Sequence, residues 1–214
     1  MAFGFARKIE TPPTRAREES VAFPCSKGRL YLPTPYDGDC SVTACQLVAL
    51  CAARNAGMDV DHGMIDRAAE YLWTCQNDDG GFNYMPKFGG SAFARSAAAL
   101  AALSASGPTD DKAAALGRAR DYLAKTLATL SDPKKRAATD FRLYGSRYAA
   151  EFLTRAPDDY RARHLPELLA SVLATQQKDG RWQGDVNDEL STAQALLTLQ
   201  IPEGRLKSAS PRAR

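Results

Sequence analysis

The chain has 214 residues, of which 44% are hydrophobic and 25% charged, and these are ordinary values for a globular protein. This composition excludes a wholly disordered chain, a collagen-like chain and a disulfide-dense mini-protein. The net charge is only +3 and no apolar run approaches about 18 residues, so we expect neither a polyelectrolyte binder nor a membrane-spanning helix.

Residues 1–35 differ from the rest of the chain because they contain five of the twelve prolines and show no helical periodicity. They carry six basic and three acidic residues, and residues 203–214 carry four basic residues and one acidic residue. We therefore predict an extended, proline-rich basic arm at 1–35 and a basic tail at 203–214. Such segments either contact another molecule or stay solvated, and the arm lacks the apolar segment of a secretory signal. Because aromatic residues do not alternate with Lys and Arg, no nucleic-acid partner is expected.

From residue 36 onward, apolar and small residues recur at helical spacing and no convincing strand pattern occurs. Seven helices are predicted, at residues 41–56, 62–76, 91–106, 110–130, 137–155, 166–177 and 190–200. Pro166 is expected in the first turn of the sixth helix, where a proline is well tolerated. Residues 36–202 are thus predicted to form one all-α domain of successive helical hairpins.

The five cysteines are an odd number without a C-x-x-C pair, which predicts free and mostly buried thiols in a reducing compartment. We therefore expect a cytoplasmic protein. A zinc site is the alternative, but only His62 and His164 are available, and neither lies at ligand spacing from a cysteine. No metal and no cofactor is predicted.

One sequence element occurs twice, each time at the end of a predicted helix. Residues 76–82 read QNDDGGF and residues 176–182 read QQKDGRW, which share the form Q-x-x-D-G-x-[FW]. Asp followed by Gly predicts a tight turn, and the aromatic residue is expected to fill the gap between adjacent hairpins. After a loop, Ser96 or Thr192 opens the next helix, whose alanines favour close packing. The residues with this structural role are Gln76, Asp79, Gly80, Phe82, Gln176, Asp179, Gly180 and Trp182.

These two elements resemble the QW repeats of squalene–hopene cyclases and related class II terpene cyclases. With the S/T-A-x-A-L sequence that comes after each, they resemble the prenyltransferase and squalene-oxidase repeat superfamily, most of all its bacterial prenyltransferase-like members. The resemblance covers residues 36–206 and implies an α/α toroid, in which inner and outer helices alternate around a central cavity. The inner helices would be 41–56, 91–106, 137–155 and 190–200. Seven helices are fewer than a closed ring of this superfamily contains, so a partial toroid with an open edge is expected.

The catalytic motifs of this superfamily are matched only in part. A class II cyclase protonates an alkene with a D-x-D-D-T motif, and residues 39–43 of this chain read D-C-S-V-T. Ser41 stands where the proton donor belongs, and a serine hydroxyl is too weak an acid for that step. Neither the zinc ligands of protein prenyltransferases nor the thioester motif of complement-like domains is matched. Asp37 and Asp39 remain the catalytic candidates, with helix capping as the alternative role of Asp39.

Five residues of the predicted inner helices are expected to line the cavity: Thr43, Arg95, Ser96, Tyr144 and Thr192, with core packing as the alternative role of Tyr144. Arg95 would either bind an anion there or pair with Asp37 or Asp39. The sequence favours a non-catalytic helical repeat module that acts as a protein-binding or assembly subunit, with a partner chain, identical or different, over its open edge. The alternative is a divergent isoprenoid cyclase or transferase, or a binder of an apolar polyprenyl ligand.

Overall fold

The computed structural model describes residues 23–24, 30–31, 39–87, 89–107, 110–184 and 186–203. It divides into two units, Met1–Asp37 and Gly38–Arg214. In the first unit, strands β1 (Phe23–Pro24) and β2 (Leu30–Tyr31) pair antiparallel, with Phe23 opposite Tyr31. The rest of the predicted arm, Asp37 and residues 204–214 of the predicted tail lie outside the described residues.

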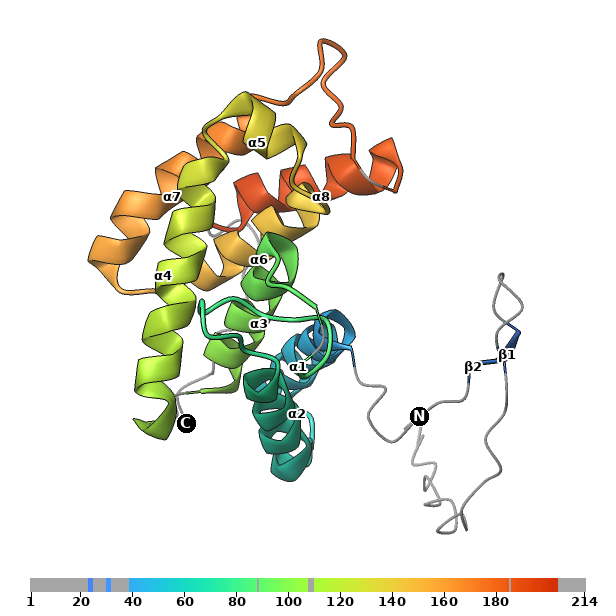
Figure 1. Cartoon of the computed structure of the whole chain (residues 1–214), viewed down its shortest axis with the longest axis vertical. Helices are drawn as coiled ribbons and strands as arrows, with labels where there is room; N and C mark the ends of the chain where they lie inside the picture. Colours follow the sequence, from blue (N-terminus) through green and yellow to red (C-terminus); the bar gives the residue numbers. More distant parts are fainter. Residues whose placement is uncertain are drawn as a thin grey trace, which may run out of the picture. The chain divides into compact units, whose positions relative to one another are not determined.

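The described part of the second unit consists of helices and their connections, which confirms the predicted all-α class (Figure 1). Seven helices correspond to the predicted ones: α1 (Cys40–Asn55), α2 (His62–Thr74), α3 (Phe93–Ser106), α4 (Ala113–Thr129), α6 (Arg142–Leu153), α7 (Asp158–Leu173) and α8 (Asp188–Gln200). A short helix, α5 (Pro133–Ala137), and a 3-10 turn, η1 (Asp110–Lys112), were not predicted as separate elements.

Contacts between the helices arrange them in two alternating sets (Figure 1). α3 contacts both α1 and α6, and α6 in turn contacts α8, so α1, α3, α6 and α8 succeed one another in a row. α2 packs on α1 and α3, α4 packs on α3, and α7 packs on α4, α6 and α8. The row contains the helices predicted as inner, and the other set contains those predicted as outer.

α3 forms the centre of the core because its alanines let neighbouring helices approach closely. All eight residues from 96 to 103 are buried, and α1, α2, α4 and α6 pack around them. One close approach involves Gly145 of α6, where a Cβ atom would lie 2.8 Å from the Cα atom of Ala94. A larger residue at this position would force α3 and α6 apart.

The prediction for the start of the sixth helix is wrong. Pro166 does not occupy its first turn, because α7 begins at Asp158 and Pro166 lies inside the helix. Asp158 and Asp159 place negative charge at the positive end of the helix dipole, which favours the earlier start. The helix accepts the proline at the cost of one backbone hydrogen bond, since proline has no N–H to donate.

The segment before α6 also differs from the prediction of a single helix over residues 137–155. Asp132 caps α5 by accepting a hydrogen bond from the backbone N–H of Lys134 at 2.9 Å. Phe141 then takes a left-handed conformation, with a φ of 49°, and α6 begins at Arg142. This turn, which L residues rarely adopt, separates α5 from α6 and brings Asp140 and Phe141 to the start of α6.

Candidate functional site

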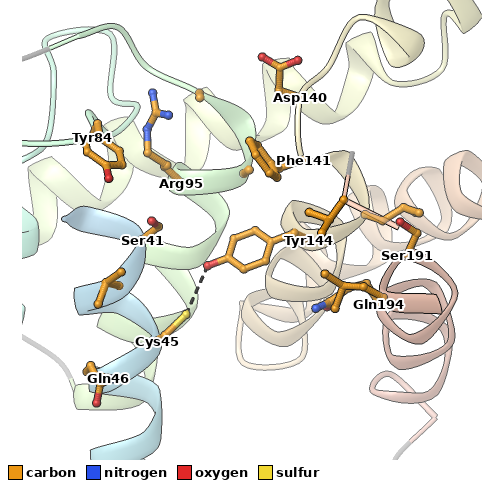
Figure 2. Close-up of a pocket in the computed structure, with 16 residues that line it drawn as sticks. Ser41, Cys45, Gln46, Tyr84, Arg95, Asp140, Phe141, Tyr144, Ser191 and Gln194 are labelled. Atoms are coloured by element: carbon orange, nitrogen blue, oxygen red, sulfur yellow. Dashed lines mark hydrogen bonds between the residues drawn. The ribbon is translucent and has the colours of Figure 1, made fainter. Parts of the chain in front are cut away.

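A pocket of about 730 Å³ lies at the N-terminal ends of the four helices of the row (Figure 2). These helices and their caps contribute Ser41, Val42, Cys45, Gln46, Ala92, Ala94, Arg95, Phe141, Leu143, Tyr144, Leu190, Ser191 and Gln194. Tyr84, Asp140 and Val186 complete the described lining. A volume of this size is within the range of small-molecule sites, which extends from about 300 to 1,000 Å³.

Large apolar side chains that are exposed to solvent are concentrated at this pocket. Val42, Tyr84, Phe141, Val186 and Leu190 all line it, and each is between 43% and 64% exposed. Single exposed apolar residues are normal on a protein surface, but five around one cavity form a patch. Such a patch is typical of a site that is covered by a ligand or a partner.

Arg95 is the positively charged residue of the described lining. One of its terminal nitrogens, Nη2, donates a hydrogen bond to the backbone carbonyl of Gly90 at 2.9 Å. Its Nε atom is buried and has no hydrogen-bond partner among the described residues. Within the same residues no carboxylate lies within ion-pair distance of Arg95, so the expected pair with Asp39 is not formed there.

A thiol and two phenols form a hydrogen-bonded cluster at the wall of the pocket. The Sγ atom of Cys45 lies 3.4 Å from the hydroxyl of Tyr144 and 3.1 Å from that of Tyr148 (Figure 2 shows the contact with Tyr144). Burial and the contact with Cys45 raise the pKa of Tyr148 to about 12, and the same causes raise the pKa of Tyr144. Both phenols are therefore neutral near pH 7 and keep their O–H donors. Arg147 lies over the Tyr148 ring at 4.6 Å from its centroid.

The four helices differ in how the N–H groups of their first turns are satisfied. At α1, Asp39 accepts a hydrogen bond from Ser41 N at 2.6 Å, and at α8, Asn187 accepts one from Leu190 N at 2.7 Å. The caps of α3 and α6 make no such side-chain hydrogen bond. The N–H groups at the starts of α3 and α6 therefore have no capping side chain, and the positive ends of their helix dipoles lie at the pocket.

Asp39, one of the two catalytic candidates, acts in the structure as the N-cap of α1. Its carboxylate also accepts a hydrogen bond from the Ser41 hydroxyl at 2.6 Å. Burial opposes ionisation, but the hydrogen bonds from Ser41, Tyr84 and the backbone outweigh it and lower the pKa of Asp39 below its ordinary value. A carboxylate held in its ionised form does not serve as a strong proton donor. Asp37, the other candidate, lies outside the described residues.

The structure divides the five residues that were expected to line the cavity. Arg95 and Tyr144 line the pocket, whereas Thr43, Ser96 and Thr192 are not part of its described lining. The hydroxyl of Ser96 accepts a hydrogen bond from the backbone N–H of another residue, Phe82, at 2.9 Å. Ser96 thus holds the preceding loop instead of contacting a ligand.

Cys45 and Gln194 are among the polar lining residues that were not expected at the pocket. Cys45 lies one helical turn after Ser41, and Gln194 lies one turn after Leu190, so both are on the same helix face as a residue of the first turn. A search over the first two turns of each inner helix would have included them. The Oε1 atom of Gln194 is buried without a hydrogen-bond partner among the described residues.

The two Q-x-x-D-G-x-[FW] loops have the same internal hydrogen bonds. The Gln amide Nε2 donates to the carbonyl of the loop glycine, at 3.1 Å for Gln76 and 3.0 Å for Gln176. Asp79 and Asp179 each accept from the backbone N–H two residues later, at 2.9 and 3.1 Å. Gly80 and Gly180 both have a φ of 87°, the left-handed conformation that favours glycine. Both aromatic residues are buried: Phe82 and Trp182.

The surroundings of the two loops differ. α4 covers the first loop: Gln76 donates to the Ala115 carbonyl at 2.9 Å, and a Cβ atom at Gly80 would collide with the backbone of Arg118. In the second loop Gln176 and Gly180 are exposed, and a Cβ atom at Gly180 would meet only the Gln176 amide, at 3.9 Å. The described residues supply no helix that covers the second loop in the way that α4 covers the first.

Within the described ranges, no three His, Cys, Asp or Glu residues are grouped so that they could hold a metal ion. Cys40, Cys45, Cys51 and Cys75 are free thiols, and all but Cys45 are buried, as predicted; Cys25 lies outside the described residues. No helix in the part of the chain that the structure describes has the length and apolar character needed to cross a membrane.

Comparison of the chain with protein-family models gives no match. Comparison with curated proteins gives no match either.

Proposed function

We propose that this chain is a non-catalytic binding module for an apolar, isoprenoid-like ligand. The observation that carries the proposal is the pocket of about 730 Å³, with its five exposed apolar side chains at the ends of the helices of the row. A cavity that is mainly apolar and has a few polar groups is the usual form of a small-molecule site. The free thiols of Cys40, Cys45, Cys51 and Cys75 support a reducing, cytoplasmic location.

The resemblance to the prenyltransferase and squalene-oxidase repeat superfamily is part of this proposal. The matching hydrogen bonds and glycine conformations of the two loops support a true structural repeat. The alternating contacts of the helices support a toroid-like arrangement that is incomplete at its open edge. In such an array the pocket would be the inner cavity.

The surroundings of the two described carboxyl groups, Asp39 and Asp140, favour a binding role over catalysis. Asp39 is committed to capping α1 and has a lowered pKa, so it does not supply the strong acid that alkene protonation requires. Asp140 is the acid of the described lining, and it is exposed to solvent. Acid–base chemistry usually depends on a carboxyl group in a protected environment, which raises its pKa.

Direct binding tests the proposal. Purified protein is mixed with farnesol, geranylgeraniol or squalene, and complexes are detected by native mass spectrometry and by the shift in melting temperature. Val42→Asp is expected to abolish binding because it places a charge in the apolar lining. Met64→Asp is the matched control, since Met64 is also an exposed third residue of a helix but lies outside the described lining. Absence of binding to the unaltered protein would contradict the proposal.

A second candidate function, that of an assembly subunit, is favoured by the exposed edge at α7 and α8. Leu196 comes four residues after Thr192, as Leu100 comes four after Ser96, yet Leu196 is 44% exposed and Leu100 is fully buried. α4 and α6 pack on α3, whereas the main contacts of α8 among the described residues are with α6 and α7. A partner chain, identical or different, would bury this edge.

Light scattering and affinity capture test this second candidate. The protein at micromolar concentration is expected to have a mass above that of one chain, or to retain a partner from a native extract. Leu196→Asp should remove the association, whereas Met58→Asp, at an exposed residue of the α1–α2 connection, should not. A single-chain mass together with no retained partner would exclude it.

A further inference from the structure

We infer that the ligand of the pocket is an apolar monocarboxylic acid, whose carboxylate pairs with Arg95. This inference rests on the proposed ligand-binding function and specifies the chemical class of the ligand. Three features support it: the hydrogen bonds that the Arg95 guanidinium leaves unmade, the charges of the lining, and the positive ends of the helix dipoles at the pocket.

Arg95 has unused hydrogen-bonding capacity at the pocket wall. Among the described residues, its Nη2 atom bonds the Gly90 carbonyl, and its buried Nε atom has no partner. The Nη1 atom of Arg95 makes no hydrogen bond among the described residues, so it can donate to an acceptor that a ligand brings into the pocket. A carboxylate is well suited because its two oxygens match the planar fork of a guanidinium.

The charge of the lining favours an anion with a single negative charge. Arg95 and Asp140 are the charged members of the described lining, so it carries one formal positive and one formal negative charge. A phosphate monoester has a charge of about −1.5 to −2 near pH 7, and a diphosphate has more. Asp140 is exposed to solvent and forms no ion pair with Arg95 among the described residues. The Arg95 guanidinium therefore has one positive charge to offer, which matches a monocarboxylate but leaves much of the charge of a phosphate without compensation.

The ends of α3 and α6 add a favourable potential for the same anion. Arg95 is the third residue of α3, so its guanidinium belongs to the same helix end as the N–H groups that lack a capping side chain. α6 also begins at the pocket without a side-chain cap. The positive dipole ends of these helices attract negative charge, and they supplement the pairing with Arg95.

The rest of the lining defines the body of the ligand. Val42, Phe141, Val186 and Leu190 present apolar surface that is exposed to solvent. Tyr84 and Phe141, drawn on either side of Arg95 in Figure 2, are aromatic residues of the same lining. A ligand with a carboxylate at one end and an apolar chain at the other satisfies both parts of the site.

A matched ligand series separates this inference from the proposed function. Two chains are used, the farnesyl chain and the linear hexadecyl chain, each with a carboxylate, a hydroxyl, a monophosphate or a diphosphate group. Dissociation constants are measured by isothermal titration calorimetry. The acid is expected to bind about 10- to 100-fold more tightly than the alcohol, which is the usual effect of a charged hydrogen bond, and more tightly than either phosphate.

Arg95→Gln is expected to lower the affinity for the acid to that of the alcohol and to leave the alcohol unchanged. Arg67→Gln is the control, because Arg67 is an exposed arginine outside the described lining. Equal binding of acid and alcohol by the unaltered protein, or tighter binding of a phosphate, would overturn the inference and leave the proposed function standing. If none of the compounds binds, both the inference and the proposed ligand-binding function are wrong. The order in which the unaltered protein binds the acid, the alcohol and the phosphates tests the inference even if Arg95→Gln does not fold.

Discussion

The side chain of Ser96 holds the backbone of Phe82: the buried hydroxyl accepts the Phe82 N–H at 2.9 Å, across the junction between a loop and the next helix. The second copy of the element repeats this bond, with the Thr192 hydroxyl accepting the Trp182 N–H at 3.1 Å. Each bond fixes the aromatic side chain between its hairpin and the next. The shared geometry of the two copies therefore depends on one hydroxyl per repeat.

Removal of this hydroxyl should destabilise the protein. Ser96→Ala leaves the buried Phe82 N–H without a partner, and we expect a loss of about 1–3 kcal/mol in the free energy of unfolding. Thr192→Ala should cost less, because its bond is only partly buried. Urea unfolding measures both, and Thr192→Ser, which retains a hydroxyl, is the control. An unchanged midpoint for Ser96→Ala would show that the hydroxyl does not support the loop.

Equivalent glycines of the two loops should respond differently to the same substitution. Gly80→Ala and Gly180→Ala both place an L residue at a φ of 87°, which costs about 1–2 kcal/mol. Gly80→Ala must also displace the backbone of Arg118, and overpacking of this kind typically costs about 1–3 kcal/mol more. Thermal unfolding of the two variants compares them directly. Equal losses would mean that α4 does not press on the first loop.

The capping carboxylate of α1 should contribute stability that depends on acid pH. Asp39→Ala is expected to cost about 0.5–2 kcal/mol near pH 7, the usual effect of losing an N-cap. Because the pKa of Asp39 is lowered in the folded protein, its contribution is present above the unfolded pKa and is lost as the pH falls through the folded pKa. The free energy of unfolding of Asp39→Ala, measured from pH 7 to pH 2, should therefore decline less steeply than that of the unaltered protein. If the free energies of unfolding of the two proteins change in parallel with pH, the ionisation of Asp39 does not contribute to stability.

Buried phenols should weaken the fold at alkaline pH. Burial raises the pKa of Tyr160, whose hydroxyl donates to the Arg120 carbonyl at 2.7 Å, to about 12, and that of Tyr148 to about the same value. In the unfolded chain a tyrosine ionises near pH 10. Between these values the unfolded chain has lost more protons, so the free energy of unfolding falls as the pH rises. Tyr160→Phe should make this fall less steep in urea titrations between pH 9 and pH 11, and an unaltered slope would contradict the assignment.

The sequence predicts the helices well where apolar spacing and chain breaks agree. The break at Asp132 and Pro133 marks the end of one helix correctly, because proline cannot continue the backbone hydrogen bonds and Asp132 caps the short helix α5. At Pro166 the same reasoning gives a wrong helix start. Packing of α7 on three other helices outweighs the one hydrogen bond that the proline removes, so the helix continues through it. The left-handed turn at Phe141 has no local signal, since an aromatic residue is not favoured there.

The candidate site could be predicted only in outline. Arg95 is recognisable from the sequence because it is a charge within an alanine-rich helix, and Tyr144 because it is an aromatic residue of a predicted inner helix. Val186 and Leu190 give no such signal, because their exposure is known only once four helix ends have converged. The spacing of apolar residues predicts which residues share a helix face, but it does not predict which faces of different helices pack together. The pocket therefore arises from packing between segments that are distant in sequence.

The uncovered second loop has a consequence for how the molecule opens. α3 is enclosed by α1, α2, α4 and α6, and α4 covers the first loop, whereas Gln176, Gly180 and Leu196 remain in contact with water. Local unfolding has a low free energy where few neighbours must be lost. Amide protons of α8 and of the loop before it should therefore exchange with deuterium well before those of α3. Because Leu190 and Gln194 of α8 also line the pocket, one wall of the site belongs to a part of the fold that we expect to open more readily than α3.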